Sequence, residues 1–383
     1  MPRPKSRRPK VALVHDHLVQ DGGAEQVVRA LLKAYPGAPL YTLVYDPAKM
    51  APDFNKLAKG RVRTSKWQQR HWAVKHYKWL LPRIDAAFRK FDLSDYDIVI
   101  SSSSGWAKSV RTGPRTLHVC YCHTPIRYIW SSADSYIAET GYPAPLKWAF
   151  RKLLGSFRRK DRRAARGVDE FIANSAYVAG RIKKYYGRGS TVLYPPVDLA
   201  RFGPSRKRGD YYLVASRLVP YKRIDVAMAA ANKLKRPLKI MGSGVDRERL
   251  AALAGPAVEF TGRVTDAKRK KLFAQARAVL NPQEEDFGIT TVEALASGTP
   301  VIAYDRGGAP EILERGKYGV LFKPQTATAL AGAIRRFERK EFSPHMLHVR
   351  AQDFSAVKFR DAIRRTVAER YRAFTVAAAK RNR

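Results

Sequence analysis

Two glutamates and a run of backbone amides lie close together in segment 276–311. A short apolar run breaks at Asn281-Pro282 into an acidic loop that holds Glu285, and a helix follows that carries Glu293. The amides of 287–290 lie at the start of this helix, where free N–H groups and the helix dipole suit an anion. Carboxylates beside such a site suit sugar hydroxyls. The segment therefore predicts a ligand that is both a phosphate and a polyol.

Two cations are predicted at the same kind of position. Arg217 follows the apolar run 211–215, and Lys222 lies near the start of the next helix. Ligands of open α/β sheets gather at the carboxyl ends of the strands, so both cations are placed where a diphosphate would lie. In a chain with 73 Lys and Arg residues, two cations alone would be unremarkable. Their position, not their presence, indicates a function.

Segment 276–311 resembles the signature of the family-4 retaining glycosyltransferases of the GT-B fold, in which seven residues separate two glutamates. The matching residues are Glu285, Phe287, Gly288, Glu293, Ala294, Gly298, Pro300, Val301 and the pair Gly307-Gly308. For either glutamate alone, a structural role would be the safer interpretation: Glu285 favours a helix start and Glu293 fits a solvated helix face. The match of the whole stretch favours the functional interpretation.

A second resemblance concerns a subgroup of this family that builds bacterial polysaccharides and O-antigens, many of whose members are mannosyltransferases. The run from Cys120 to Trp130, the opening His15-Asp16 and the segment 40–46 are similar to this subgroup. An isolated histidine at a strand exit would be taken as an ordinary side chain. Here the resemblance implies that His123 contacts the donor sugar.

The resemblance also implies roles for the other matched residues. Arg217 and Lys222 would hold the donor diphosphate, Glu293 the ribose diol, and Glu285 would orient the donor sugar. We expect His123, Arg217, Lys222 and Glu285 to be the catalytic group. The remaining donor-binding residues implied are Gly22, Gly23, Gly242, Arg263, Val264, Phe287, Gly288, Ile289, Thr290 and Glu293. No metal and no cofactor is implied, because the nucleotide sugar is a substrate and two side-chain cations neutralise its phosphates.

Short apolar runs alternate with helical segments through most of the chain, which predicts parallel sheets covered by helices. The resemblance implies an α/β protein with the GT-B fold, in which two Rossmann-like, doubly wound domains face a cleft. We expect an acceptor domain at 1–200 and a donor domain at 201–354. A terminal helix at about 355–375 would cross back to the first domain through the apolar stripe Val357, Phe359, Ile363, Val367 and Tyr371.

The formal charge of +40 on 383 residues indicates a polyanionic partner or surface. Segments 66–91 and 147–166 interleave aromatic and basic residues. Each is either a helical segment with a solvated basic face or a surface for anionic lipid. A nucleic-acid-binding protein is the alternative from another class, although no recognisable nucleic-acid motif supports it. A filter-binding assay with nucleic acid across a salt series would separate a nucleic-acid-binding protein from an enzyme.

Three further sequence features bear on metal binding, on the cysteines and on membrane insertion. Asp95-Tyr96-Asp97 has the D-x-D form of metal-dependent transferases, but it precedes a strand instead of following one. Cys120 and Cys122 lack the partners of a zinc site and are expected to be reduced core thiols in a cytosolic protein. No uncharged stretch is long enough to span a bilayer.

The expected reaction is retaining transfer of a sugar, with GDP-mannose favoured as the donor, to a lipid-linked glycan acceptor. The enzyme would be peripheral at the inner face of the cytoplasmic membrane. The alternatives within enzymes are a glucosyl- or other hexosyltransferase of the same fold, a sugar-nucleotide epimerase or a phosphorylase.

Overall fold

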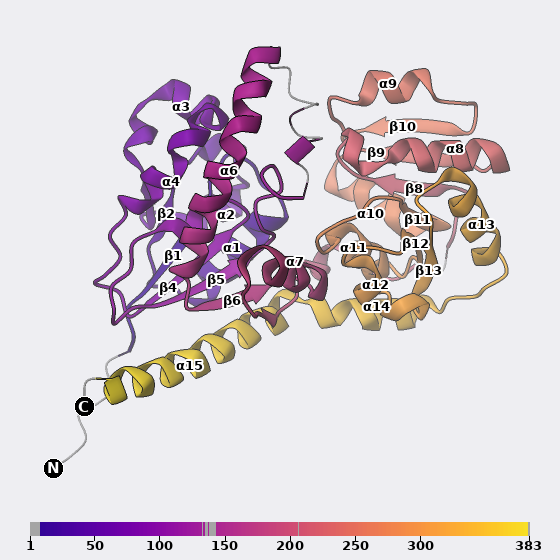
Figure 1. Cartoon of the computed structure of the whole chain (residues 1–383). Coiled ribbons are helices and arrows are strands. Elements are labelled where there is room, and N and C mark those ends of the chain that lie inside the picture. Colours follow the sequence, from indigo (N-terminus) through magenta and orange to yellow (C-terminus); the bar gives the residue numbers. More distant parts are fainter. Residues whose placement is uncertain (1–7, 132, 135–136, 138–142, 206, 382–383) are drawn as a thin grey trace. The chain divides into compact units, whose positions relative to one another are not determined.

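Each half of the chain folds around its own parallel sheet (Figure 1). The structure is a computed structural model, and it describes residues 8–131, 133–134, 137, 143–205 and 207–381. It divides the chain into two units, Met1–Pro195 with Phe359–Arg383, and Pro196–Lys358. The predicted α/β class with two Rossmann-like domains is confirmed.

The first unit contains a seven-stranded sheet with the order β3-β2-β1-β4-β5-β6-β7, and every pair of neighbouring strands is parallel. Its strands are β1 Val11–His15, β2 Leu40–Thr42, β3 Val62–Thr64, β4 Ile98–Ser103, β5 Leu117–Cys122, β6 Glu170–Ala173 and β7 Thr191–Val192. Its helices before the second unit are α1 Gly23–Ala34, α2 Pro52–Ala58, α3 His71–Lys75, α4 Leu81–Arg89, α6 Ala144–Arg166 and α7 Ala176–Tyr186. Every residue of β4 and β5 is buried, as expected when helices cover both faces of a sheet.

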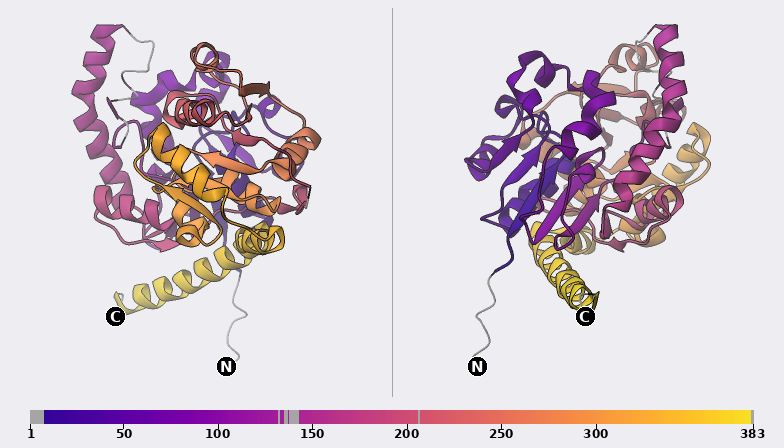
Figure 2. Two further views of the ribbon diagram at one scale, coloured as in Figure 1. Left: turned by 90° about the vertical axis from the view of Figure 1, so that its right-hand side faces the viewer. Right: turned by 60° about the vertical axis from the view of Figure 1, so that its left-hand side comes forward.

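The C-terminal helix α15, Ala356–Arg381, completes the first unit (Figures 1 and 2). Phe359, Ile363 and Val367 recur every fourth residue and are buried in the core beside β1 and α1. Arg364 donates from Nε to the carbonyl oxygen of Ala34 over 2.9 Å. Val357 is 56% exposed, so its predicted place in the apolar stripe is wrong. The buried stripe begins one half-turn later, at Phe359.

The second unit contains a six-stranded parallel sheet with the order β10-β9-β8-β11-β12-β13. Its strands are β8 Tyr212–Ala215, β9 Leu238–Met241, β10 Val258–Gly262, β11 Ala278–Asn281, β12 Val301–Tyr304 and β13 Gly319–Phe322. Its helices are α8 Ile224–Leu234, α9 Arg247–Ala252, α10 Asp266–Gln275, α11 Ile289–Ala296, α12 Ala309–Ile312, α13 Ala327–Phe337 and α14 Pro344–Ala351. In both sheets the strand order reverses beside the first strand of the unit, between β1 and β4 and between β8 and β11. Ligands of doubly wound folds bind at such points.

Three local features of the first unit bear on the predictions. Within segment 40–46, which is similar to the polysaccharide subgroup, only Leu40–Thr42 forms a strand, and β3 is a short strand at the edge of the sheet. The carboxylate of Asp97 accepts a hydrogen bond of 2.6 Å from the Lys10 amide at the amino end of β4, so the D-x-D segment does precede a strand. Cys120 and Cys122 are buried free thiols.

The basic and aromatic segment 66–91 forms short helices, and several of its aromatic and aliphatic side chains pack on the core. Trp67, Tyr77 and Leu81 pack on the core that includes Phe88, whereas Trp72 is 47% exposed. The segment therefore has the character of a packed element with a solvated face. Segment 147–166 lies within the single helix α6 and exposes two large apolar side chains, Trp148 and Leu153.

Candidate functional site

Lys222 and Glu285 form an ion pair at the carboxyl edge of the second sheet. Lys222 ends the 3₁₀ helix Pro220–Lys222 that follows β8, and Glu285 lies in the loop after β11. The Lys222 Nζ donates to Oε1 of Glu285. Because β8 and β11 are the neighbours between which the strand order reverses, the two charges lie at the topological switch point.

Two buried amide side chains, linked by hydrogen bonds, hold Glu285 in place. Gln283 donates from Nε2 to Glu285 Oε1 over 2.9 Å, and the same nitrogen donates to Asn281 Oδ1. Asn281 in turn donates from Nδ2 to the hydroxyl of Thr291 in α11 over 2.9 Å. Neither Gln283 nor Asn281 was predicted as a site residue, although both lie within the motif.

The Gly307-Gly308 pair lets a second loop lie against the backbone of this acidic loop. A Cβ on Gly307, whose φ is +82°, would lie 2.2 Å from the Glu285 carbonyl oxygen, and a Cβ on Gly308 would lie 2.3 Å from that of Phe287. The Gly308 amide donates to the Glu285 carbonyl over 2.9 Å. These contacts fix the backbone from which the Glu285 side chain projects, and only glycine fits there.

The predicted helix start after Glu285 is present. Gly288, with φ +109°, caps α11, which begins at Ile289. Phe287 is buried with its ring 5.6 Å from that of Phe354, and Thr290 lies in the first turn. The four residues predicted to bind the donor therefore surround one helix N-terminus, beside the ion pair.

Glu293 lies inside α11 and is 7% exposed. Arg269 of α10 donates from Nη2 to its carboxylate. Burial raises the pKa of Glu293 above its ordinary value, and the charge and hydrogen bond of Arg269 oppose this rise. Arg269 was not predicted, because no signal in the sequence links it to a glutamate that lies 24 residues later.

Arg217, Gly242, Arg263 and Val264 lie at the same edge of the second sheet. A Cβ on Gly242, with φ +140°, would lie 1.9 Å from the Ser216 carbonyl oxygen, so the loops after β9 and β8 touch through their backbones. The exposed Arg217 donates from Nη2 to the hydroxyl of Tyr221 over 3.0 Å. Arg263, followed by Val264 in the loop after β10, donates to Ser243 Oγ over 2.9 Å.

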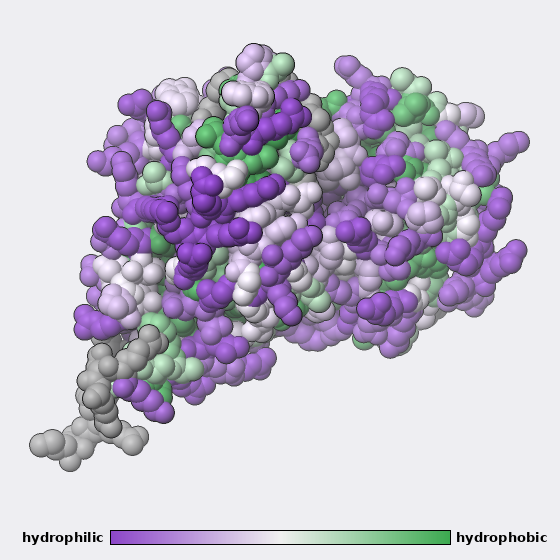
Figure 3. Space-filling model, in the orientation of Figure 1, coloured by the Kyte–Doolittle hydropathy of each residue, from purple (hydrophilic) through white to green (hydrophobic). Residues whose placement is uncertain are grey.

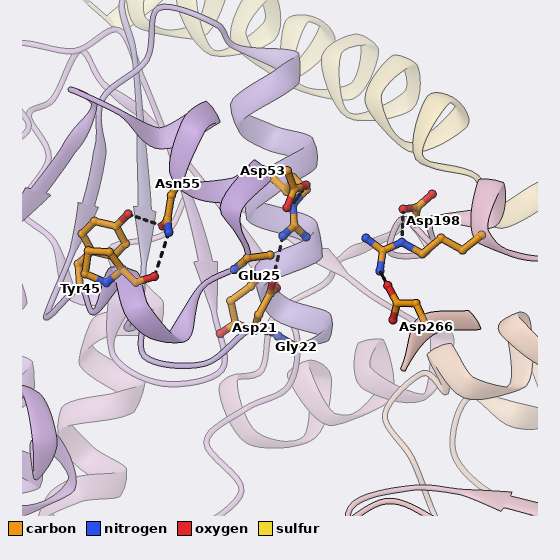
Figure 4. A network of polar contacts seen from close by, with 12 residues as sticks. Asp21, Gly22, Glu25, Tyr45, Asp53, Asn55, Asp198 and Asp266 are labelled. Atoms are coloured by element: carbon orange, nitrogen blue, oxygen red, sulfur yellow. Dashed lines mark hydrogen bonds and ion pairs between the residues drawn. The ribbon is translucent and has the colours of Figure 1, made fainter. Parts of the chain in front are cut away.

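The predicted residues of the first unit also lie at a switch point, where β1 and β4 end. His123 directly follows β5, and its Nε2 lies 2.8 Å from the hydroxyl of Ser102. Burial, together with the nearby His15, lowers the pKa of His123 to about 4. The Gly22 amide donates to Glu25 Oε2 over 2.8 Å at the start of α1, where Gly23 is the first helical residue (Figure 4).

His15, Glu25 and Ser102 were not predicted as site residues. His15 Nδ1 lies 3.0 Å from the Ser102 carbonyl oxygen and 3.2 Å from its hydroxyl, and His15 Nε2 lies 3.5 Å from Glu25 Oε1. All three side chains are buried. His15 ends β1 and Ser102 lies next to the last residue of β4, at the carboxyl edge where ligands of such sheets bind. That position was the signal that could have identified these two residues.

Among residues 8–131, 133–134, 137, 143–205 and 207–381, no group of three or more His, Cys, Asp or Glu side chains is placed to hold a metal ion. Within the same residues, none of the helices has the length and apolar character needed to cross a membrane.

Comparison with known sequences matches the two halves of the chain to two family descriptions. Residues 21–201 match "Glycosyltransferase Family 4", and residues 199–354 match "Glycosyl transferases group 1". A D-inositol 3-phosphate glycosyltransferase of Streptomyces scabiei is 27% identical over 282 residues, which cover 63% of this chain and 60% of that protein. A GDP-mannose-dependent alpha-(1-6)-phosphatidylinositol monomannoside mannosyltransferase of Mycobacterium tuberculosis is 33% identical over 205 residues, covering 45% and 53%. These matches span between half and two thirds of the curated relatives' length.

Solved structures share the fold across nearly the whole chain. HepE of Anabaena in complex with UDP and glucose superposes with a TM-score of 0.69 at 19% identity, covering 94% of this chain and 100% of that one. Sucrose-phosphate synthase of Thermosynechococcus elongatus superposes with a TM-score of 0.68 at 18% identity, covering 96% and 100%. With two family descriptions that together span residues 21–354, the chain belongs to the family-4 glycosyltransferases with the GT-B fold.

Proposed function

We propose that the protein transfers a hexosyl unit from a nucleotide diphosphate sugar to an acceptor hydroxyl, with retention of the anomeric configuration. The observation that carries the proposal is the contact between Lys222 and Glu285 beside the start of α11, at the switch point of the second sheet. A cation and a helix N-terminus suit a diphosphate, and the adjacent carboxylate suits the hydroxyls of the attached sugar.

In this reaction the bond between the anomeric carbon and the diphosphate oxygen breaks, and the acceptor oxygen bonds to that carbon. The proton of the acceptor hydroxyl passes to the departing diphosphate. Negative charge grows on the diphosphate as the bond breaks, so Arg217, Lys222 and the start of α11 stabilise the transition state more than the bound substrate. Glu285 would orient the sugar once a phosphate competes for Lys222, and Glu293 would accept hydrogen bonds from the ribose diol.

GDP-mannose is the donor that we favour, and a lipid-linked glycan is the favoured acceptor. Support comes from the mycobacterial relative, whose name states a GDP-mannose donor and a phosphatidylinositol monomannoside acceptor. A glucosyl- or other hexosyltransferase is the alternative. Some relatives are named D-inositol 3-phosphate glycosyltransferases. The transfer assay therefore also includes inositol phosphate, a phosphorylated acceptor that is not a lipid.

We further propose that α6 holds the enzyme at the inner face of the cytoplasmic membrane. Trp148 is 61% exposed, and Leu146 and Leu153 are also exposed, two turns apart. The Nζ of Lys152 lies 5.5 Å from the centre of the Trp148 ring. Figure 3 shows apolar surface among hydrophilic side chains over this part of the first unit. Exposed apolar side chains among cations are typical of interfacial helices. The exposed cations of α6 are Arg151, Lys152, Arg159, Arg162, Arg163 and Arg166.

The experiment that tests the reaction begins with thermal unfolding in the presence of GDP-, UDP- and ADP-sugars, since a ligand that binds only the folded state raises Tm. The stabilising donor is then incubated with lipid-linked glycans and with inositol phosphate. NMR of the product gives the configuration at the new glycosidic bond. We expect a GDP-sugar to raise Tm and the product to keep the donor's configuration. An inverted product would overturn the retaining reaction, and stabilisation by UDP-sugars alone would overturn the mannose preference.

A further inference from the structure

Three hydrogen bonds and one ion pair between mostly buried groups link the glycine loop of the first unit to His123. This chain of groups runs from the Gly22 amide to Glu25, from Glu25 to His15, from His15 to Ser102, and from Ser102 to the imidazole of His123. We infer that Glu25, His15 and Ser102 are positioning residues that fix His123 as the tautomer protonated at Nδ1. The inference rests on the proposed function only in what His123 does for the bound sugar.

The protonation state of His15 follows from what surrounds its two nitrogens. Nδ1 lies 3.0 Å from the carbonyl oxygen of Ser102, which can only accept, so Nδ1 carries a hydrogen. Nε2 lies 3.5 Å from the carboxylate of Glu25, which also only accepts when ionised. A hydrogen on Nδ1 and a carboxylate at ion-pair distance from Nε2 together favour the imidazolium form of His15. The ion pair with Glu25 raises the pKa of His15 against the opposing effect of its burial, which agrees with this state.

The other charged and titratable groups around His15 are Asp16, His17 and His123. Asp16 favours the charged form of His15 and itself accepts from the amides of Ser104 and Ala107, at 2.7 and 2.8 Å. Burial lowers the pKa of His17, so this neighbour stays neutral. The same holds for His123, with a pKa of about 4. One cation and two carboxylates thus share this site, and neither remaining imidazole adds a charge at neutral pH.

The state of His15 determines which way the hydroxyl of Ser102 points. His15 Nδ1 already directs its hydrogen toward the oxygens of Ser102, so that hydroxyl cannot donate back to it. The Ser102 side chain is fully buried, and a buried hydroxyl without an acceptor is costly. Nε2 of His123, at 2.8 Å, is the acceptor that the structure supplies. A neutral imidazole that accepts at Nε2 carries its hydrogen at Nδ1.

The consequence for the reaction is that His123 donates a hydrogen bond. Its Nδ1–H group can bind an oxygen of the donor sugar, whereas its Nε2 lone pair is occupied and cannot remove a proton from the acceptor. His123 therefore binds and orients, and general-base catalysis by this residue is excluded in the arrangement described.

The test uses the protein labelled with ¹⁵N at histidine, in which long-range ¹H–¹⁵N correlations distinguish the two tautomers and the imidazolium ion. A His123→Gln variant assigns the His123 signals. We expect the Nδ1–H tautomer for His123 and the imidazolium pattern for His15 at neutral pH. His123 protonated at Nε2, or a neutral His15, would overturn the inference whether or not any sugar transfer is found.

The same strand supplies a matched pair of variants. Ser102→Ala removes the hydrogen bond to His123, whereas Ser101→Ala removes an equivalent buried bond of 2.9 Å to His118, on the opposite face of β4. We expect Ser102→Ala to give a mixture of His123 tautomers and a kcat about three- to tenfold lower, the typical value of one hydrogen bond. Ser101→Ala should leave the His123 spectrum and kcat unchanged.

Two outcomes separate this inference from the proposed function. If Ser101→Ala and Ser102→Ala alter the His123 spectrum and kcat equally, the chain is only structural and the inference fails. If the wild type transfers no sugar from any nucleotide donor while the spectra are as expected, the proposed function fails and the tautomer assignment stands. The spectrum of a Glu25→Gln variant is a further test. Because glutamine is uncharged, His15 should then show the pattern of a neutral imidazole.

Discussion

Lys222 and Glu285 neutralise each other across the carboxyl ends of β8 and β11. Each side chain is about one-sixth exposed, at 15% and 17%, so a ligand reaches both charges. A diphosphate that binds Lys222 competes with Glu285 for the ammonium group. In the proposed reaction the carboxylate would then be available to the sugar attached to that diphosphate, so binding of the diphosphate would prepare the contact with the sugar.

Lys222→Ala should fold normally and lose transfer activity by about 10²-fold or more, because the charge on the departing diphosphate is left uncompensated. Turnover with the stabilising nucleotide sugar measures the loss. Lys239→Ala is the control, since Lys239 forms a 2.7 Å pair with Glu259 in the same sheet and lies away from the loop of Glu285. That variant should change the free energy of unfolding by only about 0–1 kcal/mol and leave turnover intact. Near-normal turnover of Lys222→Ala would remove Lys222 from the mechanism.

Glu293→Gln should weaken nucleotide binding, because an amide reproduces only part of what a carboxylate offers to two ribose hydroxyls. The wild type should also lose affinity as the pH falls through the pKa of Glu293, which lies above its ordinary value. Titration calorimetry across this range gives the profile. The variant should lack this pH dependence, and identical profiles in the two proteins would contradict the assigned role.

The pH dependence that Glu293 gives to the free energy of unfolding is opposite in direction to the one expected for nucleotide binding. A raised pKa in the folded state means that Glu293 contributes stability at pH values below its unfolded pKa and that this contribution is lost as the pH rises through the raised value.

Gly307→Ala should displace the backbone of Glu285, because the new Cβ would lie 2.2 Å from the Glu285 carbonyl oxygen. Gly316→Ala is the matched control, since Gly316 also has a positive φ, +110°, but a Cβ there meets no atom within 4 Å. Backbone strain alone should cost the control about 1 kcal/mol of unfolding free energy. The Gly307 variant should lose a further ~1–3 kcal/mol from overpacking, together with most of its activity. Chemical denaturation and turnover measure both, and equal losses in the two variants would show that the contact is unimportant.

Transfer activity should survive excess EDTA, and Asp95→Ala should be almost neutral. The structure places Asp95-Tyr96-Asp97 before β4, where ligands of such sheets do not gather. Activity that the chelator abolishes and that Mg²⁺ or Mn²⁺ restores would contradict this prediction.

The protein should co-sediment with anionic vesicles and not with zwitterionic ones, and binding should weaken as salt shortens the Debye length below about 8 Å. Each cation near an anionic leaflet contributes about 1 kcal/mol. Reversing Arg151, Lys152 and Arg159 of α6 to Glu should release the protein. Reversing the equally exposed Arg335, Arg339 and Lys340 of the second unit is the matched control. A wild type that ignores anionic vesicles at low salt would show that the charge serves another partner.

Two other cations of α6, Arg158 and Arg162, are unsuitable for this reversal. Arg158 donates to the Ile129 carbonyl over 2.7 Å and Arg162 to that of Tyr185 over 3.1 Å. Both guanidinium groups also lie over the Trp130 ring, at 5.4 and 5.0 Å. Replacing them would disturb the fold as well as the surface.

The sequence predicted those site residues that lie within one short stretch of the chain. Glu285, Gly288 and the start of α11 lie in one continuous stretch, where chain breakers and spacing determine the loop and the helix. The partners of these residues were not predicted, because Arg269 and Ser102 reach Glu293 and His123 only through the tertiary fold. For the same reason the pattern of α15 indicated an apolar stripe but not its first buried residue. Periodicity gives the face of a helix, and packing decides where contact begins.

The return of α15 to the first unit makes the second unit an insertion within the first. Phe359, Ile363 and Val367 are synthesised after all of Pro196–Lys358, yet they complete the core around β1 and α1. During translation the second unit is therefore whole while the first still lacks part of its apolar interior. A chain that stops before Phe359 leaves the core of the first unit incomplete, whereas the core of the second unit is whole. Both cores are complete only in a chain that extends through Val367.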